Sequence, residues 1–309
     1  MSWRLPRRSG SMTCMDAVWI RHYTAASALG LGREATRAAL EEGRCALAPC
    51  SFESARLTTW VGEVAGVDEV QLPAALAAYN CRNNRLAQLG LSQDGFTELA
   101  RERIAHWGAA RVGVFMGTST SGVLETEIAY RQRDASAGRL PPGFEYRRAH
   151  NAFALTDYVR SVLGATGPAV TICTACSSSA KVFAAAARML DAGLIDAAVV
   201  GGVDSLCLTT LYGFHSLQLT ASGPCRRFRR YQCEPEPRPS QSRGPERSRF
   251  LHRRARDRQQ PAWFSVKLQS LLKGYRISHS FLIDERAQIC PQLRERAVDD
   301  LGRGSRRRR

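Results

Sequence analysis

Residues 171–180 read TICTACSSSA and combine two cysteines, Cys173 and Cys176, with a run of three serines. Cys176 follows a short apolar stretch and precedes an alanine-rich one, so we expect its thiol where a strand passes into a helix. A cysteine thiolate is a nucleophile that can form a thioester with an acyl group. Cys176 is therefore the first candidate for a catalytic residue.

The expected strand-to-helix turn gives this thiol a suitable electrostatic setting. The first backbone N–H groups of a helix have no partners within the helix, and they carry the positive end of its dipole. Both effects favour the thiolate over the thiol at Cys176. The alternative is that Cys176 packs as a small apolar side chain, as many buried cysteines do.

The chain up to Cys225 alternates helical and strand patterns around this motif. Compact apolar runs predict buried strands at residues 110–117, 168–173 and 196–202. Apolar residues at spacings of three and four predict helices at residues 33–44, 72–91, 150–164 and 177–194. This order predicts an α/β fold with a mainly parallel sheet that is layered by helices.

Several separate motifs, in the same order along the chain, resemble one protein family. TACSSSA is followed by DAAVVGGVDSL and SGPCRRF, and it is preceded by ASALGLGREATRAALEEGRCAL, NCRNNRLAQLGL and GVFMGTSTSG. Together they resemble the beta-ketoacyl-acyl-carrier-protein synthases (3-oxoacyl-ACP synthases) of the thiolase-like superfamily. The resemblance covers residues 16–228 and implies the N-terminal half of a layered α-β-α-β-α fold.

The resemblance implies a decarboxylative condensation of an acyl thioester with malonyl-ACP, in fatty-acid or polyketide synthesis. Cys176 would take the acyl group from acyl carrier protein, and its backbone N–H would form part of the oxyanion hole. The implied partners are acyl carrier protein and a homodimer or a heterodimer with a full-length synthase. No cofactor and no metal are implied.

Two glycine-containing motifs have both a functional and a purely local interpretation. Gly117, Thr118, Ser119 and Thr120 are candidates for the substrate pocket, but a Gly/Ser/Thr loop is also a flexible turn. In GGVD, residues 201–204, the glycines either let two backbones pass closely or provide a tight strand exit with positive φ. We favour the second interpretation of GGVD.

The histidines that the family uses are not recognisable in this sequence. The resemblance implies two histidines from the second half of the fold, in a His-Gly-Thr and an Asn-His motif, together with a supporting lysine. The six histidines are His22, His106, His150, His215, His252 and His279, and none stands in such a motif. We therefore expect condensation by this chain alone to be very slow.

The last quarter of the chain has a different composition. Up to Cys225 there are 21 Lys and Arg against 19 Asp and Glu, whereas the whole chain has 44 against 28 and a net charge of +16. Residues 229–309 are rich in Arg, Pro and Ser, and we expect a disordered basic tail. Its mildly apolar segment, 263–283, would form at most a short helix without partner elements.

A one-base shift of the reading frame near Phe228 would explain this change together with the missing second half. The shifted codons permit a CRRFDAI continuation, close to the CRPFD of the family. Resequencing the codons for residues 224–234 tests this hypothesis.

Two other functions remain open, and several properties are expected by default. The basic tail could bind nucleic acid through phosphates, although aromatic residues among its basic ones are few. The chain could also be a non-catalytic partner of a full-length synthase. Cys173 and Cys176 form one C-x-x-C, which leaves a redox pair or half of a metal site possible. We expect a reduced cytoplasmic protein without a membrane span, whose basic start, residues 1–15, is disordered and is not a signal peptide.

Overall fold

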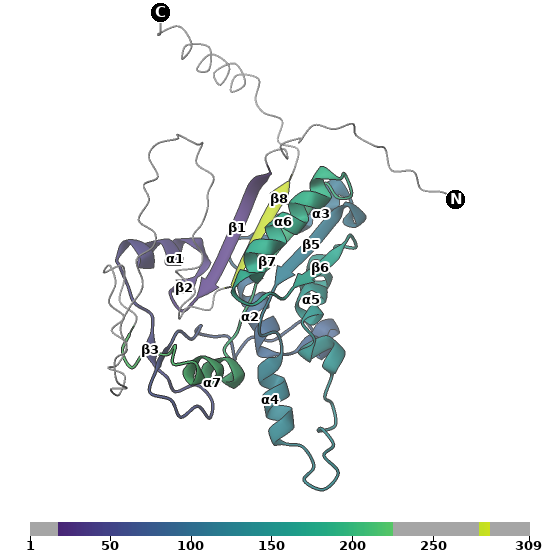
Figure 1. Ribbon diagram of the computed structural model, residues 1–309. Helices are drawn as coiled ribbons and strands as arrows, with labels where there is room; N and C mark the ends of the chain where they lie inside the picture. The colour runs from purple at the N-terminus through teal and green to yellow at the C-terminus, as the bar shows by residue number, and fades with distance from the viewer. Residues whose placement is uncertain (1–17, 225–277, 285–309) are drawn as a thin grey trace, which may run out of the picture.

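One mixed β-sheet lies at the centre of the computed structural model, which describes residues 18–224 and 278–284 (Figure 1). Its strands are β1 (Trp19–Ser27), β2 (Gly30–Leu31), β5 (Val112–Gly117), β6 (Ala169–Ile172), β7 (Ala197–Gly202) and β8 (Ser278–Asp284). The order across the sheet is β2-β1-β8-β7-β5-β6. Strands β6 and β7 run parallel to β5, whereas β8 is antiparallel to both β7 and β1.

Helices cover the sheet, and shorter elements connect them. The α-helices are α1 (Gly32–Glu41), α2 (Arg82–Leu91), α3 (Phe96–Trp107), α4 (Val123–Arg131), α5 (Phe153–Leu163), α6 (Ser178–Asp191) and α7 (Leu208–Ser216). Short helical turns lie at Ala74–Tyr79, Ala109–Arg111, Tyr146–His150 and Ala175–Ser177. A separate two-stranded ribbon consists of β3 (Ala48–Pro49) and β4 (Trp60–Val61).

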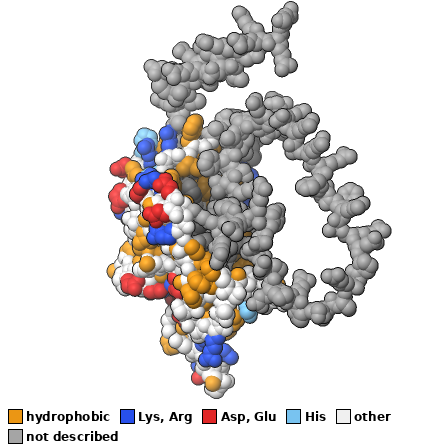
Figure 2. Space-filling view, turned by 90° about the vertical axis from the view of Figure 1, so that its left-hand side faces the viewer, with side chains coloured by type: hydrophobic (Ala, Val, Ile, Leu, Met, Phe, Trp, Pro, Cys, Tyr) orange, Lys and Arg blue, Asp and Glu red, His pale blue; other side chains and the backbone are white. Residues whose placement is uncertain are grey.

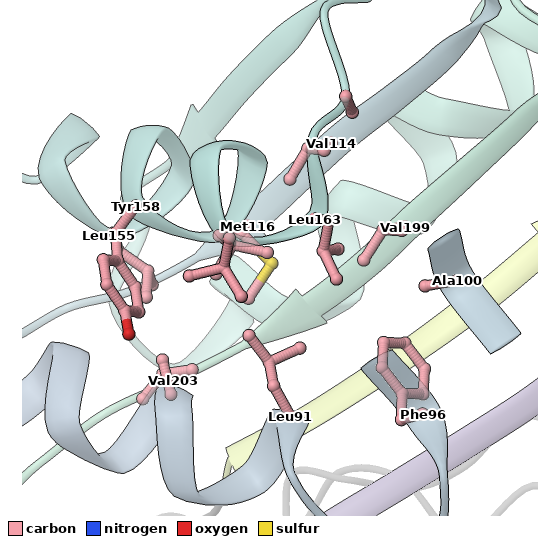
Figure 3. Packing of buried hydrophobic residues seen from close by; sticks show 14 of the residues in the cluster. Leu91, Phe96, Ala100, Val114, Met116, Leu155, Tyr158, Leu163, Val199 and Val203 are labelled. Carbon is pink, nitrogen blue, oxygen red and sulfur yellow. The ribbon is translucent and has the colours of Figure 1, made fainter. Parts of the chain in front are cut away.

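The alternation of side chains along β5 and β7 separates two apolar layers. On β5, Val114 and Met116 face the larger cluster with α2, α3 and α5, which Figure 3 shows around Leu155 and Tyr158. Phe115 points to the opposite face, where it packs with residues of α6. The fold is therefore an α/β fold in which helices lie on both faces of the sheet.

The three strands predicted from the sequence are confirmed by β5, β6 and β7. The expected helix at residues 72–91 is wrong in its first half. A 3₁₀ turn ends at Tyr79, and α2 begins only at Arg82, because Cys81 is extended and caps α2 by accepting a hydrogen bond from the Asn84 N–H at 3.4 Å. The other three predicted helices are confirmed by α1, α5 and α6.

Strand β8 corrects two further expectations. Residues 278–284 belong to the segment expected to have no partner elements, yet they form a strand that pairs with β1 on one side and β7 on the other. The sheet is also less parallel than expected, because the β1–β2, β1–β8 and β8–β7 pairs are all antiparallel.

Several expectations concern residues outside the described part of the chain. These are the disordered start at 1–15, the domain boundary at Phe228 and the rest of the tail, at 229–277 and 285–309. Among the residues that the structure describes, no helix is both long and apolar enough to cross a membrane. On the face shown in Figure 2, acidic and basic side chains of the described residues are interspersed rather than separated by sign.

Candidate active site

Cys176 lies in the 3₁₀ turn Ala175–Ser177, which joins the end of β6 to the start of α6. Its side chain is exposed, whereas Ser178, two residues later, is only 1% exposed. The Cys176 thiol thus lies at the surface, whereas the first turn of α6 packs against the sheet. This placement agrees with the strand-turn-helix arrangement that the sequence predicts, and it excludes a Cys176 packed in the core.

Hydroxyl groups of the serine run hold this turn in shape. The Ser178 Oγ accepts a hydrogen bond from the Thr174 N–H at 2.9 Å and donates to the Ala175 carbonyl oxygen at 2.7 Å. The Ser177 Oγ donates to the Thr174 carbonyl oxygen at 2.9 Å. Ala175 itself has φ of 52°, a left-handed conformation that a residue with a Cβ rarely adopts. Such a conformation persists only where its surroundings fix it, as these serines do.

Two glycines let the first turn of α6 sit directly on the sheet. A Cβ atom on Gly117, at the end of β5, would lie 2.6 Å from the backbone nitrogen of Ser179. A Cβ atom on Gly202, at the end of β7, would lie 1.9 Å from the Ser179 Oγ. At Gly202, close approach rather than a strand exit with positive φ is therefore the reason for glycine, and the positive-φ interpretation of GGVD is wrong. Neither Gly201 nor Gly202 has a positive φ.

The loop after β5 is fixed by one carboxylate, that of Asp204. Its Oδ1 accepts hydrogen bonds from the Ser119 N–H at 2.6 Å and from the Thr120 N–H and Oγ1 at 3.1 and 3.0 Å. The Thr118 Oγ1 donates to the same oxygen at 3.3 Å. The loop is thus a constrained turn rather than a flexible one.

The four predicted pocket residues differ in their surroundings. Gly117, Thr118 and Thr120 are buried, the two threonines at 0% and 1% exposure. Ser119 is exposed, and its Oγ donates to the Ala175 carbonyl oxygen at 2.9 Å. The structure therefore brings Ser119 to the Cys176 turn and places the two threonines behind it. A pocket-lining role for these residues stays a prediction.

The described histidines do not activate Cys176. Of the four in residues 18–224, His150 has its Nδ1 at 2.6 Å from the Thr126 Oγ1 on α4. Burial lowers the pKa of His150. In the part of the chain that the structure describes, no hydrogen bond joins a histidine to Cys176.

A second polar cluster lies apart from Cys176, around Arg82. Its guanidinium is buried, with Nη2 at 3.0 Å from Asp68 and 3.4 Å from Glu63, and it stacks on the Phe52 ring at 4.8 Å. These residues line a cavity of about 220 Å³ together with Glu125, whose carboxylate accepts a hydrogen bond from the Arg82 N–H at 2.5 Å. Burial raises the pKa of Glu125. In this cluster the positive charge of Arg82 is compensated by the negative charges of Asp68 and Glu63.

No metal site is evident in the described ranges, where no three His, Cys, Asp or Glu side chains are grouped so that they could hold an ion. Cys173 and Cys176 are both exposed free thiols.

Asp204 is the last residue of the GGVD motif, and the sequence pattern alone assigns no role to it. A signal for it existed, because an acidic residue that directly follows a buried strand lies at the same sheet edge as the loop after a neighbouring parallel strand. Without the strand order, however, the sequence did not show that β5 and β7 are neighbours.

Comparisons with known proteins agree with this geometry. Residues 83–232 match the family model of the beta-ketoacyl synthase N-terminal domain. The spectinabilin polyketide synthase system protein NorC of Streptomyces orinoci is 36% identical over 133 residues, which are 42% of this chain and 6% of NorC. A mycocerosic acid synthase-like polyketide synthase of Mycolicibacterium smegmatis is 33% identical over 137 residues, again 42% of this chain and 6% of that protein.

Solved structures show the same fold. The ketosynthase ApeO in complex with its chain length factor ApeC, from Xenorhabdus doucetiae, matches with a TM-score of 0.62 at 24% identity, over 88% of this chain and 59% of that one. A beta-ketoacyl synthase from Burkholderia phymatum matches with a TM-score of 0.58 at 18% identity, over 88% of this chain and 60% of that one. The chain thus spans 59 to 60% of these two solved chains and 6% of the two polyketide synthases.

The layered α/β fold with a cysteine at a strand-to-helix turn is the fold of the ketosynthase structures that it matches. Residues 83–232 match the N-terminal domain of the beta-ketoacyl synthases, and this match, together with the similarity to the two polyketide synthases, supports the N-terminal part of a beta-ketoacyl synthase.

Proposed function

We propose that Cys176 accepts an acyl group from an acyl-carrier-protein thioester, as the first half-reaction of a beta-ketoacyl synthase. The observation that supports this most directly is the exposed thiol in a turn fixed between β6 and the start of α6. A nucleophile needs both access to substrate and a defined position, and this turn provides both.

The half-reaction is an acyl transfer between two sulfur atoms. The Cys176 thiolate attacks the carbonyl carbon of the donor thioester, and the negative charge moves to the carbonyl oxygen. The tetrahedral intermediate then expels the carrier thiolate, which takes a proton from water, and the acyl group remains on the Cys176 Sγ. The N–H of Cys176 lies at the start of a helical turn and is the donor that we assign to the oxyanion.

The second half-reaction, decarboxylative condensation with a malonyl thioester, needs groups that the described residues do not supply. It requires donors that stabilise the thioester enolate formed when carbon dioxide leaves. Neither His22, His106, His150 nor His215 is hydrogen-bonded to the Cys176 turn. We therefore propose that the chain alone forms the acyl-cysteine but condenses very slowly.

Mass spectrometry of the intact chain tests the first half-reaction. The full chain is incubated with octanoyl-acyl carrier protein, and the expected result is one added acyl group that hydroxylamine removes. Cys176→Ala should abolish the adduct. Cys173→Ala is the matched control, because Cys173 is also exposed and lies three residues away, and it should leave the adduct unchanged. Acylation that persists in C176A would overturn the proposal.

A second candidate is a non-catalytic partner of a full-length synthase. Strand β6 ends the sheet on one side, and all four of its residues are only partly buried, unlike those of β5 and β7. An open strand edge can pair with another chain. Co-purification with a full-length synthase from the same source favours this candidate, provided that acylation of Cys176 is absent.

The nucleic-acid alternative depends on the 23 Lys and Arg residues after Cys225, all of which lie outside the described part of the chain. Binding to DNA or RNA that is lost at high salt would favour it over both candidates above.

A further inference from the structure

Ser119 and Cys176 are connected through one peptide group. The Ser119 Oγ donates a hydrogen bond to the carbonyl oxygen of Ala175 at 2.9 Å. That carbonyl belongs to the same planar peptide unit as the N–H of Cys176, and the described chain has no cis peptide bond. In a trans peptide the C=O and N–H bonds point in opposite directions. A donor that fixes the carbonyl of Ala175 therefore also fixes the direction of the Cys176 N–H.

The peptide needs such support because Ala175 has φ of 52°. Two groups of Ser178, its hydroxyl at 2.7 Å and its backbone N–H, also donate to the Ala175 carbonyl. These two belong to the same turn and move with it. Ser119 is the donor that comes from a different segment, the loop after β5, and it ties the turn to the sheet.

Asp204 in turn holds Ser119. The carboxylate accepts the Ser119 N–H at 2.6 Å and the Thr120 N–H at 3.1 Å. A chain of contacts thus runs from the end of β7, through the loop after β5, to the turn after β6. Because these three strands are parallel neighbours, their C-terminal ends lie along one edge of the sheet.

We propose that Ser119 is a positioning residue that orients the Cys176 N–H toward the oxyanion of the acyl-transfer step, with Asp204 holding Ser119 in place. This inference rests on the proposed function. A donor that already points at the developing charge needs no reorganisation during the reaction, which is the source of its catalytic effect.

The experiment compares two reactions of Cys176 in the full chain. Acyl transfer from octanoyl-acyl carrier protein forms an oxyanion, whereas alkylation by iodoacetamide displaces iodide and forms none. Ser119→Ala should slow acylation at saturating donor about two- to tenfold, as expected for the loss of one hydrogen bond, and leave the half-saturating donor concentration unchanged. The alkylation rate of Cys176 should stay at the wild-type value.

Two further variants separate positioning from general effects. Ser119→Thr keeps the hydroxyl and should restore most of the acylation rate. Ser161→Ala is the matched control, since Ser161 is also exposed and donates to a backbone carbonyl, that of Asp157, at 2.7 Å. It should acylate at the wild-type rate.

The outcomes are distinguishable from those that test the proposed function. If the wild-type chain forms no acyl-cysteine, the proposed function fails, and this inference fails with it. If the unmodified chain acylates and S119A does so equally fast, the function stands and the inference is wrong. A parallel loss of acylation and alkylation in S119A would also overturn it, because the serine would then support the turn as a whole.

Discussion

Gly117 lies against the backbone of Ser179, so close that a Cβ atom on the glycine would be 2.6 Å from the serine nitrogen. It would also be 2.7 Å from the carbonyl carbon of Ser178. Both neighbours are backbone atoms of the first turn of α6 and cannot rotate away. The position of α6, the helix that follows Cys176, therefore depends on the absence of a Cβ atom at Gly117.

We expect Gly117→Ala to displace the start of α6 and to lower the free energy of unfolding by about 3 kcal/mol, as overpacking does in a close-packed core. Denaturant unfolding of the full chain measures the loss. Gly213→Ala on α7 is the control, because nothing lies within 4 Å of the added Cβ there, and a Gly-to-Ala change inside a helix should leave the stability unchanged or raise it by up to about 1 kcal/mol. Equal stability of G117A and G213A would show that α6 is not seated on this glycine.

The buried Arg82 leads to a second prediction. In Arg82→Met the carboxylates of Asp68 and Glu63 lose their shared partner, and the Phe52 ring loses its stacked cation. We expect a loss of about 1–3 kcal/mol in the free energy of unfolding, because the hydrogen bonds from the buried guanidinium to two carboxylates are lost, while both carboxylates are partly exposed and Asp68 keeps Arg85 as a partner. Arg37→Ala on α1 removes an exposed ion pair with Glu34 and should leave the melting temperature unchanged. A similar melting temperature for both variants would contradict a structural role for Arg82.

The sequence predicted the elements nearest to Cys176 better than those farther away. Strands β5 and β7 have uniform apolar patterns because each is buried between layers, whereas β6 and α6 were recognisable from a short apolar run and an alanine-rich run. Strand β1, by contrast, alternates poorly, with Trp19, Ile20 and Tyr23 exposed, so its sequence pattern does not predict a strand. Strand β8 has partners that are more than 70 residues away along the chain, which no local pattern reveals.

The site itself could be predicted only in part, for the same reason. Cys176 stands out by residue type and by its place between a strand and a helix. The carboxylate of Asp204 and the hydroxyl of Ser119 reach that place through contacts between segments 56 to 85 residues apart. Such contacts follow from strand order, which the sequence alone did not provide.

From the burial of Glu125 we expect the free energy of unfolding to depend on pH. Burial raises its pKa above the ordinary value of 4.5, so the folded state binds the proton more tightly than the unfolded state. The contribution of Glu125 to the free energy of unfolding is then complete below the ordinary pKa and is lost as the pH rises through the folded-state pKa.

Glu125→Gln keeps an oxygen that can accept the Arg82 N–H but carries no charge. We expect its melting temperature, relative to wild type, to increase from about pH 4 to about pH 7. Glu98→Gln on α3 is the control for losing one negative charge at an exposed position. A constant difference in melting temperature between E125Q and wild type from about pH 4 to about pH 7 would show that Glu125 does not titrate as its burial implies.

The last prediction concerns β8, which joins β1 to β7. The register places Leu282 opposite His22 of β1 and Val199 of β7, so its backbone lies between two paired strands. A proline at this position has no N–H to donate and is not tolerated in the interior of a sheet. We expect Leu282→Pro to melt at a clearly lower temperature than Leu282→Ala, the comparison that isolates the backbone effect at one position. Equal melting temperatures for L282P and L282A would mean that residues 278–284 do not connect β1 to β7 in solution.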